Sequence, residues 1–240
     1  MGDFLGAYWP LIGISVSAAV ILMAQQRRTS VIGLLLNYLF VAAFLSQQQF
    51  IKPDLDILGF MVSTTVLVKI IAGVSAVSIL AITALTFSRD YEASALDEFS
   101  LAELRRAARQ ARRLEIVSPR RFADIVVPMW AMVLVAIASF ILPRLYPIGS
   151  EEVDFAWYWL TLTGFFTIVT ASDVLKLGLG LLLCVSSIDL LYTAIASTVQ
   201  VFPLALLGLT TIVLSLAVSY LSGLMFGRLK TLELNELYKR

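Results

Sequence analysis

One long apolar stretch indicates the fold class of this chain: Ile57 to Phe87 reads ILGFMVSTTVLVKIIAGVSAVSILAITALTF. Its single charged residue is Lys69. A helix needs about 20 apolar residues to cross the hydrocarbon core of a bilayer, so this stretch is long enough to span a membrane. Because an ammonium group inside a bilayer is costly, Lys69 is the first candidate for a functional residue.

The composition of the whole chain agrees with a membrane protein. Hydrophobic residues make up 59% of its 240 positions, against roughly 45 to 50% in soluble domains. They form continuous runs, whereas the strands of outer-membrane barrels alternate between apolar and polar residues. Helices are then the only way to satisfy the backbone in lipid. The sequence predicts an all-α, polytopic transmembrane bundle with a strand content close to nil.

Hydropathy and turn signals predict about seven spans. They lie near residues 7-26, 30-50, 57-87, 123-146, 155-172, 174-197 and 203-227. The third run is longer than one bilayer needs, so it either tilts strongly or continues as a helix into the cytoplasm. The expected organisation is a three-span unit at 1-87, a cytoplasmic helix within 88-122, and a four-span unit with a short cytoplasmic tail at 123-240.

The distribution of basic residues predicts the orientation in the membrane. With the N-terminus outside and the C-terminus in the cytoplasm, most of the 18 Lys and Arg residues face the cytoplasm, and only Lys52 and Arg144 face outward. The segment Met1 to Tyr8 lacks the basic region of a signal peptide, so we expect the first run to remain as a span. We expect the protein in the inner, or plasma, membrane of a bacterium.

The predicted cytoplasmic segment, 88-122, has acidic residues first and arginines after them. Ser100 and Glu103 form a capping-box pattern that opens a helix, and Pro119 should close it. Its basic residues include Arg105, Arg106, Arg109, Arg112 and Arg113. Such an amphipathic helix would rest on anionic lipid headgroups or dock a cytoplasmic partner. Nucleic acid is not an expected partner.

Asp189 is the second charged residue that lies well inside a predicted span, away from the span's ends. It lies in the sixth span, at a depth similar to that of Lys69 in the third, so an ion pair between the two is geometrically allowed. One interpretation is structural: the pair pins two helices together, or Lys69 contacts a neighbouring polypeptide. The other is a titrating element in a proton or cation path.

A stripe of small residues runs along the last predicted span. Its members are Ser215, Ser219, Gly223 and Gly227, one at every fourth position. Small residues at this spacing let another helix approach closely. The stripe predicts either packing within the bundle or a contact with another polypeptide.

The chain has no histidine and only one cysteine, Cys184, which lies in an apolar run. Histidine is the commonest protein ligand for haem, zinc and copper, and the only side chain with an unperturbed pKa near neutrality. Cys184 is best interpreted as a small buried hydrophobic residue. We therefore expect no catalytic residues, no metal site and no cofactor.

Two segments of the chain resemble each other. Arg27 and Arg28 precede Gly33-Leu34-Leu35-Leu36-Asn37, and Asp173 and Lys176 precede Gly180-Leu181-Leu182-Leu183-Cys184. Both segments start a predicted span that runs from inside to outside. They suggest two three-span units in the same orientation, spans one to three and five to seven, with the fourth span as a connector.

Each unit resembles the three-span subunit K of NADH-quinone oxidoreductase and its relatives, the corresponding small membrane protein of Mrp antiporters and component E of hydrogenase-4. The stretch Gly180 to Leu191 matches the spacing of that family's glycine-leucine helix. The resemblance implies a small helical subunit beside a larger pump. However, the family's membrane glutamate falls on Leu182 here and on Leu35 in the first unit, so proton transfer would be lost or rerouted through Asp189 and Lys69.

Together these features predict a non-catalytic integral membrane subunit of a larger energy-converting complex, whether respiratory, photosynthetic or ion-translocating. Its expected partners are other membrane subunits and anionic lipids at the cytoplasmic surface. The alternative is a small self-sufficient ion-coupled transporter that uses Lys69 and Asp189.

Overall fold

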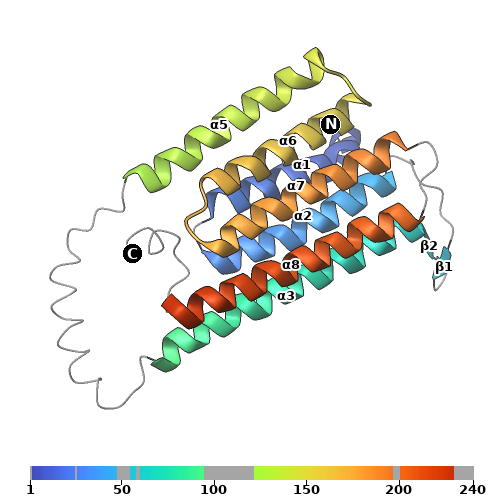
Figure 1. Ribbon diagram of the computed structural model, residues 1–240. Helices are drawn as coiled ribbons and strands as arrows, with labels where there is room; N and C mark the ends of the chain where they lie inside the picture. The colour runs from blue at the N-terminus through green and yellow to red at the C-terminus, as the bar shows by residue number, and fades with distance from the viewer. Residues whose placement is uncertain are drawn as a thin grey trace.

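Seven helices make up most of the chain that the computed structural model describes, namely residues 2–24, 26–47, 55–57, 60–94, 122–196 and 201–229. They are α1 (Gly2–Met23), α2 (Arg27–Gln47), α3 (Thr64–Ser94), α5 (Phe122–Leu145), α6 (Glu151–Val169), α7 (Val174–Ile195) and α8 (Val201–Leu229). The prediction of a helical bundle is confirmed (Figure 1).

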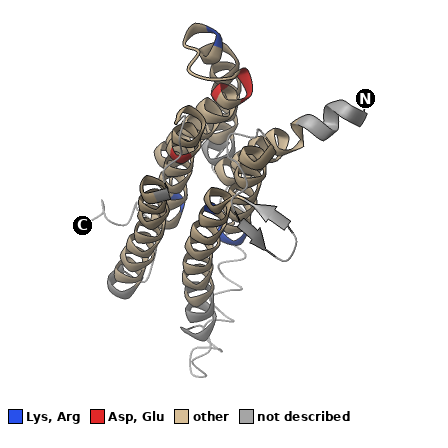
Figure 2. Ribbon diagram, turned by 90° about the vertical axis from the view of Figure 1, so that its right-hand side faces the viewer, with Lys and Arg blue, Asp and Glu red and all other residues tan. Residues whose placement is uncertain are grey.

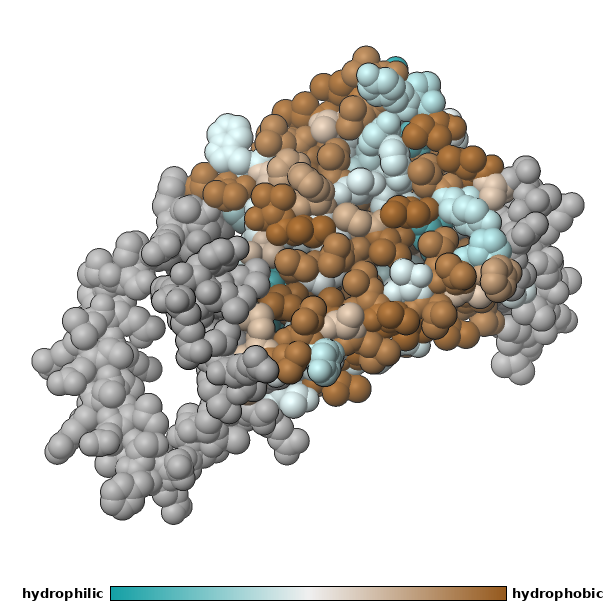
Figure 3. Space-filling model, in the orientation of Figure 1, coloured by the Kyte–Doolittle hydropathy of each residue, from teal (hydrophilic) through white to brown (hydrophobic). Residues whose placement is uncertain are grey.

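Five of these helices are long and apolar enough to cross a membrane, which indicates a membrane protein. The qualifying segments are Arg27–Gln47, Thr64–Thr86, Val126–Leu145, Val174–Ile195 and Phe202–Phe226. The apolar part of α1, Tyr8–Met23, is shorter. Hydrophobic residues cover most of the described surface in the view of Figure 3.

The predicted start of the third span at residue 57 is wrong, while the strand content of the described residues is close to nil, as predicted, apart from one short hairpin. Two short antiparallel strands, β1 (Leu55–Ile57) and β2 (Phe60–Val62), precede α3, with Asp56 opposite Met61. The part of α3 that is long and apolar enough to cross a membrane is the 23 residues Thr64–Thr86, which at 1.5 Å per residue reach about 34 Å. This length already covers a bilayer core of about 30 Å, so the apolar residues before Thr64 are not needed for the span.

Two other helix boundaries bear on the predicted spans. α3 continues to Ser94, seven residues past Phe87, so the third run does extend as a helix into the segment expected to be cytoplasmic, as one of the two alternatives had it. α6 begins at Glu151 rather than near residue 155. The Asp154 carboxylate accepts the backbone N–H groups of Ile148 (3.0 Å) and Gly149 (2.9 Å), which holds the chain turn just before α6. Acidic residues in the first turn also favour a helix start there.

The helices form two rows of three. α1, α2 and α3 make the first unit, α6, α7 and α8 make the second, and within each row neighbouring helices are in contact. Across the rows α1 contacts α6, α2 contacts α7, and α3 contacts α8. α5 lies at the edge of the bundle, against α6 and α1 (Figure 1).

The two units share the same packing between their first and second helices when Gly33 is aligned with Gly180. A Cβ on Gly33 would lie 3.0 Å from Ile21 Cγ1 and 3.4 Å from the Ser17 carbonyl oxygen. A Cβ on Gly180 would lie 2.7 Å from Ile168 Cγ1 and 2.8 Å from the Gly164 carbonyl oxygen. In this alignment Ile168 is the equivalent of Ile21, and Gly164 is the equivalent of Ser17.

A polar contact repeats in the same register. Asn37 Nδ2 donates to the Ile14 carbonyl oxygen at 3.4 Å, and the Cys184 thiol lies 4.0 Å from the Thr161 carbonyl oxygen. The alignment pairs Asn37 with Cys184 and Ile14 with Thr161. The similarity seen in the sequence therefore extends to the way each unit packs its first two helices.

Candidate functional site

The structure brings together Lys69 and Asp189, the two embedded charged residues singled out from the sequence. Lys69 Nζ lies 3.1 Å from Asp189 Oδ2 and donates a second hydrogen bond, of 3.3 Å, to the Asp189 backbone carbonyl. The side chains are 5% and 17% exposed. The carboxylate and the carbonyl of one residue thus surround the ammonium group on α3.

Local helix geometry places both groups at the same depth. Lys69 lies near the start of α3 and Asp189 near the end of α7. At 1.5 Å per residue each residue is about 8 to 9 Å from its helix end. The two ends meet because α3 and α7 run in opposite directions. The hydroxyl of Thr193, one turn after Asp189, donates to the same Asp189 carbonyl at 2.7 Å.

Residues from two further helices complete a polar cluster around the pair. Tyr38 on α2 is buried, and its ring lies against Gly73, where an added Cβ would be 2.7 Å from Tyr38 Cγ. Its hydroxyl is close to Asp189 and to Thr211 on α8. Gly208 allows α8 to approach α3 at this level, because its Cβ position lies 3.3 Å from Ala72 Cβ. Four helices, two from each unit, meet here.

The cluster contains two buried polar atoms without a hydrogen-bond partner. They are Asp189 Oδ1 and the Tyr38 hydroxyl oxygen. Lys69 contacts only the other carboxylate oxygen of this residue, Asp189 Oδ2. A carboxylate oxygen has lone pairs that are able to accept one more donor, such as a water molecule. Sequence analysis missed Tyr38 and Thr211, because neither tyrosine nor threonine is unusual inside an apolar run.

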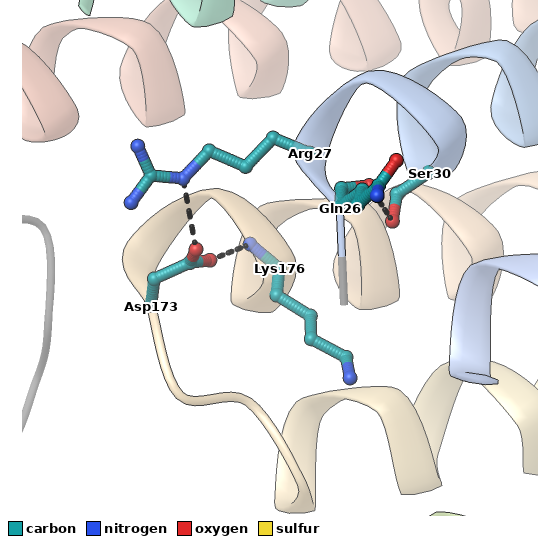
Figure 4. Close-up of polar contacts among 5 residues, drawn as sticks. All are labelled: Gln26, Arg27, Ser30, Asp173 and Lys176. Atoms are coloured by element: carbon teal, nitrogen blue, oxygen red, sulfur yellow. Dashed lines mark hydrogen bonds and ion pairs between the residues drawn. The ribbon is translucent and has the colours of Figure 1, made fainter. Parts of the chain in front are cut away.

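A second ion pair joins the starts of α2 and α7. Arg27 Nε lies 3.3 Å from Asp173 Oδ2. The other oxygen of Asp173 accepts the backbone N–H of Lys176 at 2.6 Å and so caps α7, while the Lys176 ammonium group points away (Figure 4). The sequence offered a signal for this contact, since Arg27 and Asp173 begin the two similar segments. The contact shows that α2 and α7 begin side by side, at the same end of the bundle.

Charged residues are sparse along the described helices (Figure 2). Within the described residues no group of three or more Asp, Glu, Cys or His side chains is placed to hold a metal ion. The Asp189 carboxylate has Lys69 as its charged neighbour. The chemistry open to this site is ion pairing, hydrogen bonding and proton exchange.

The small-residue stripe on α8 is packed over only part of its described length. Ser215 is fully buried, and the Ser219 hydroxyl lies 2.6 Å from that of Thr83 on α3. Gly223 is exposed, with no atom within 4 Å of its Cβ position. Gly227 is in α8, but its surroundings fall outside the described residues. The stripe therefore contributes to the α3–α8 contact at Ser215 and Ser219.

Other predicted residues are placed as follows. Arg105, Arg106, Arg109, Arg112 and Arg113, with the helix expected around them, lie outside the described residues. Leu182, at the position of the family's membrane glutamate, is fully buried, and Leu35 is partly buried. Cys184 is partly buried between α7 and α6.

Comparison of the chain with known protein families, with curated proteins and with solved structures found no match. The fold and the polar cluster thus define a helical membrane protein with an ion pair between two similar three-helix units.

Proposed function

We propose that this chain is a non-catalytic integral subunit of a larger energy-converting complex, respiratory, photosynthetic or ion-translocating, in a bacterial inner membrane. In this proposal α1 and α6 cross the membrane as well, giving seven spans with the N-terminus outside and the C-terminus in the cytoplasm. The basic segment containing Arg105 would lie on anionic lipid at the cytoplasmic surface. The resemblance of each three-span unit to subunit K of NADH-quinone oxidoreductase supports a position beside a larger pump.

The observation that carries the proposal is the use of embedded polar groups to join helices. Lys69 and Asp189 join α3 to α7. Hydroxyl and amide groups make the same kind of contact elsewhere: Thr83 with Ser219 between α3 and α8, Thr161 with Ser187 between α6 and α7, and Asn37 with Ser17 between α1 and α2. Groups satisfied in this way stabilise a scaffold.

Exposed apolar surface on α5 and α8 offers room for larger neighbours. α5 exposes Trp130 and Phe140, and α8 exposes Leu209 and Tyr220. Lipid or other membrane subunits would cover these side chains.

Extraction in a mild detergent followed by native electrophoresis tests this proposal. The untagged chain should migrate in a band far larger than its own 26.4 kDa, and mass spectrometry of that band should find other membrane polypeptides. A band that contains this chain alone, whatever its size, would contradict the proposal.

A self-sufficient ion-coupled transporter is the second candidate, favoured by one observation. Asp189 Oδ1 is buried and unpartnered beside the ion pair, so this carboxylate oxygen is available to take up a proton. Under this alternative, Lys69→Ala and Asp189→Asn should each abolish ion-coupled flux in vesicles. Asp173→Asn, at the other ion pair, serves as the control. Unchanged flux in both test variants would eliminate this candidate.

A further inference from the structure

We propose that this protein associates head-to-tail with a second copy of itself, through one outer face of each three-helix unit. The first outer face carries Trp9, Ile12, Val16, Ile32, Leu36 and Leu39, on α1 and α2. The second outer face carries Phe165, Val169 and Ile188, on α6 and α7. The inference goes beyond the proposed function and does not depend on it.

Equivalent residues of the two units have opposite exposure. With Gly33 aligned to Gly180, Ile32 and Leu36 are 59% and 42% exposed, whereas their counterparts Leu179 and Leu183 are both 0% exposed. The reverse holds on the other side of the same helices, because Val41 is 2% exposed and its counterpart Ile188 is 56% exposed.

The first and sixth helices show the same inversion. Trp9, Ile12 and Val16 are exposed on α1, while the corresponding residues Ala156, Trp159 and Thr163 are buried on α6. On the opposite side, Ala18 and Leu22 are fully buried on α1, while their counterparts Phe165 and Val169 are exposed on α6. The inversion therefore extends over the first two helices of each unit.

Contacts along each row identify what covers the buried faces. Gly33 faces α1 and Tyr38 faces α3, so the remaining buried side of α2, with Leu34, Val41 and Leu45, lies toward α7. In the second unit, Gly180 faces α6 and Gly178 faces Val218 of α8. The buried side of α7 with Leu179 and Leu183 therefore lies toward α2, in the same core cluster.

The two units thus meet through different faces, which is a heterologous contact. An isologous two-fold contact would bury the same residues in both units. A heterologous contact leaves one face of each kind unused, and repeating it builds rings or open chains. In this chain the unused faces are the two outer faces, which correspond to the faces joined inside the molecule.

A second copy fits these outer faces because repeating the heterologous contact keeps the helices of the added copy in the same direction across the membrane. α2 and α7 begin at the same end of the bundle, so a neighbour placed by the same operation keeps its helices in the orientation that one membrane requires. α5 does not interfere, because both outer faces remain exposed with α5 in place. Lipid and a different polypeptide are the competing occupants.

Thiol cross-linking in native membranes tests the proposal. In a Cys184→Ser background the chain has no other cysteine, so Leu39→Cys and Ile188→Cys report on one outer face each. These two positions are at similar heights in parallel helices. Copies of the two variants with different tags are expressed together and treated with a short bifunctional thiol reagent.

We expect a dimer that contains both tags in the mixed membranes and no dimer from either variant alone. A chain with both cysteines should give a ladder of multimers. Replacing Ile188→Cys with Ile137→Cys, which is exposed on α5, should abolish the mixed dimer. No product from the mixed pair, a dimer from one variant alone, or a product with a different polypeptide only would each overturn the proposal. The proposed function is judged separately, by other polypeptides in the native band.

Discussion

Lys69 and Asp189 come from different units, so their ion pair is a bond between the two halves of the bundle. Arg27 and Asp173 make the corresponding bond at the other end, where α2 and α7 begin. α7 takes part in both pairs, through Asp173 at its start and Asp189 near its end. The charged side chains of α7 therefore attach it to the first unit at two levels.

Removal of one partner of the Lys69–Asp189 pair should destabilise the protein strongly. Lys69→Ala or Asp189→Asn alone leaves a buried group without its partner, a change that costs about 3 to 5 kcal/mol in comparable buried pairs. The double variant should lose less stability than the sum of the single losses. Thermal unfolding in detergent measures all three.

The control is replacement of both charges by apolar groups. Lys69→Met with Asp189→Leu should be far closer to the parent in stability than either single variant, because no unpaired charge remains. Strictly additive losses from the two sites would show that the pair does not couple the units.

Asp173 has two separable roles, which two substitutions distinguish. Asp173→Ala removes both the cap of α7 and the partner of Arg27, and loss of such a cap costs about 1 kcal/mol. Asp173→Asn keeps an oxygen that can accept the Lys176 N–H and removes only the partly exposed ion pair, whose contribution is about 0 to 1 kcal/mol. Unfolding temperatures should rank parent, Asp173→Asn and Asp173→Ala in descending order. Equal losses in both variants would contradict the capping role.

At the scale of elements, the close contact between α6 and α7 depends on two glycines that face each other. Added Cβ atoms on Gly164 and Gly180 would meet the other residue's carbonyl oxygen at 2.9 and 2.8 Å. These obstacles are backbone atoms, so no side-chain rotation can relieve them. The α6–α7 contact therefore tolerates added volume poorly at these two positions.

Gly180→Ala should accordingly push α6 and α7 apart, at a cost of about 1 to 3 kcal/mol typical of overpacking. Gly33→Ala, which meets mainly the Ile21 side chain, should cost less. Gly223→Ala is the matched control, because nothing lies within 4 Å of its Cβ position. It should leave the unfolding temperature unchanged or slightly higher, since alanine favours helix more than glycine does. Similar losses in Gly180→Ala and Gly223→Ala would refute the close contact.

At the scale of the whole molecule, the membrane orientation can be tested with two positions at opposite ends of one helix. Glu151 and Ser172 are exposed at opposite ends of α6. In a Cys184→Ser background, a membrane-impermeant thiol reagent applied to intact cells should label Glu151→Cys. It should label Ser172→Cys only after permeabilisation. The reverse result would invert the orientation predicted from the basic residues.

Much of this architecture could be predicted from local sequence. Continuous apolar runs predicted helices because lipid leaves the backbone no other partner. Lys69 and Asp189 were conspicuous because a charge within such a run is costly. The hairpin before α3 was missed, since the apolar residues 57 to 62 read equally well as part of the span. Tyr38 and Thr211 were missed because their importance depends on where four helices meet.

The sequence by itself determined the class of protein, the approximate helices and the two embedded charges, because bilayer solvation acts on each segment separately. Only the tertiary structure decided which side of each helix is buried. In lipid, apolar residues face both neighbours and solvent, so hydropathy does not distinguish Leu36 from Leu183. Shape complementarity between neighbouring helices makes that choice, and it buries Leu183 inside the bundle while leaving its counterpart Leu36 at the surface.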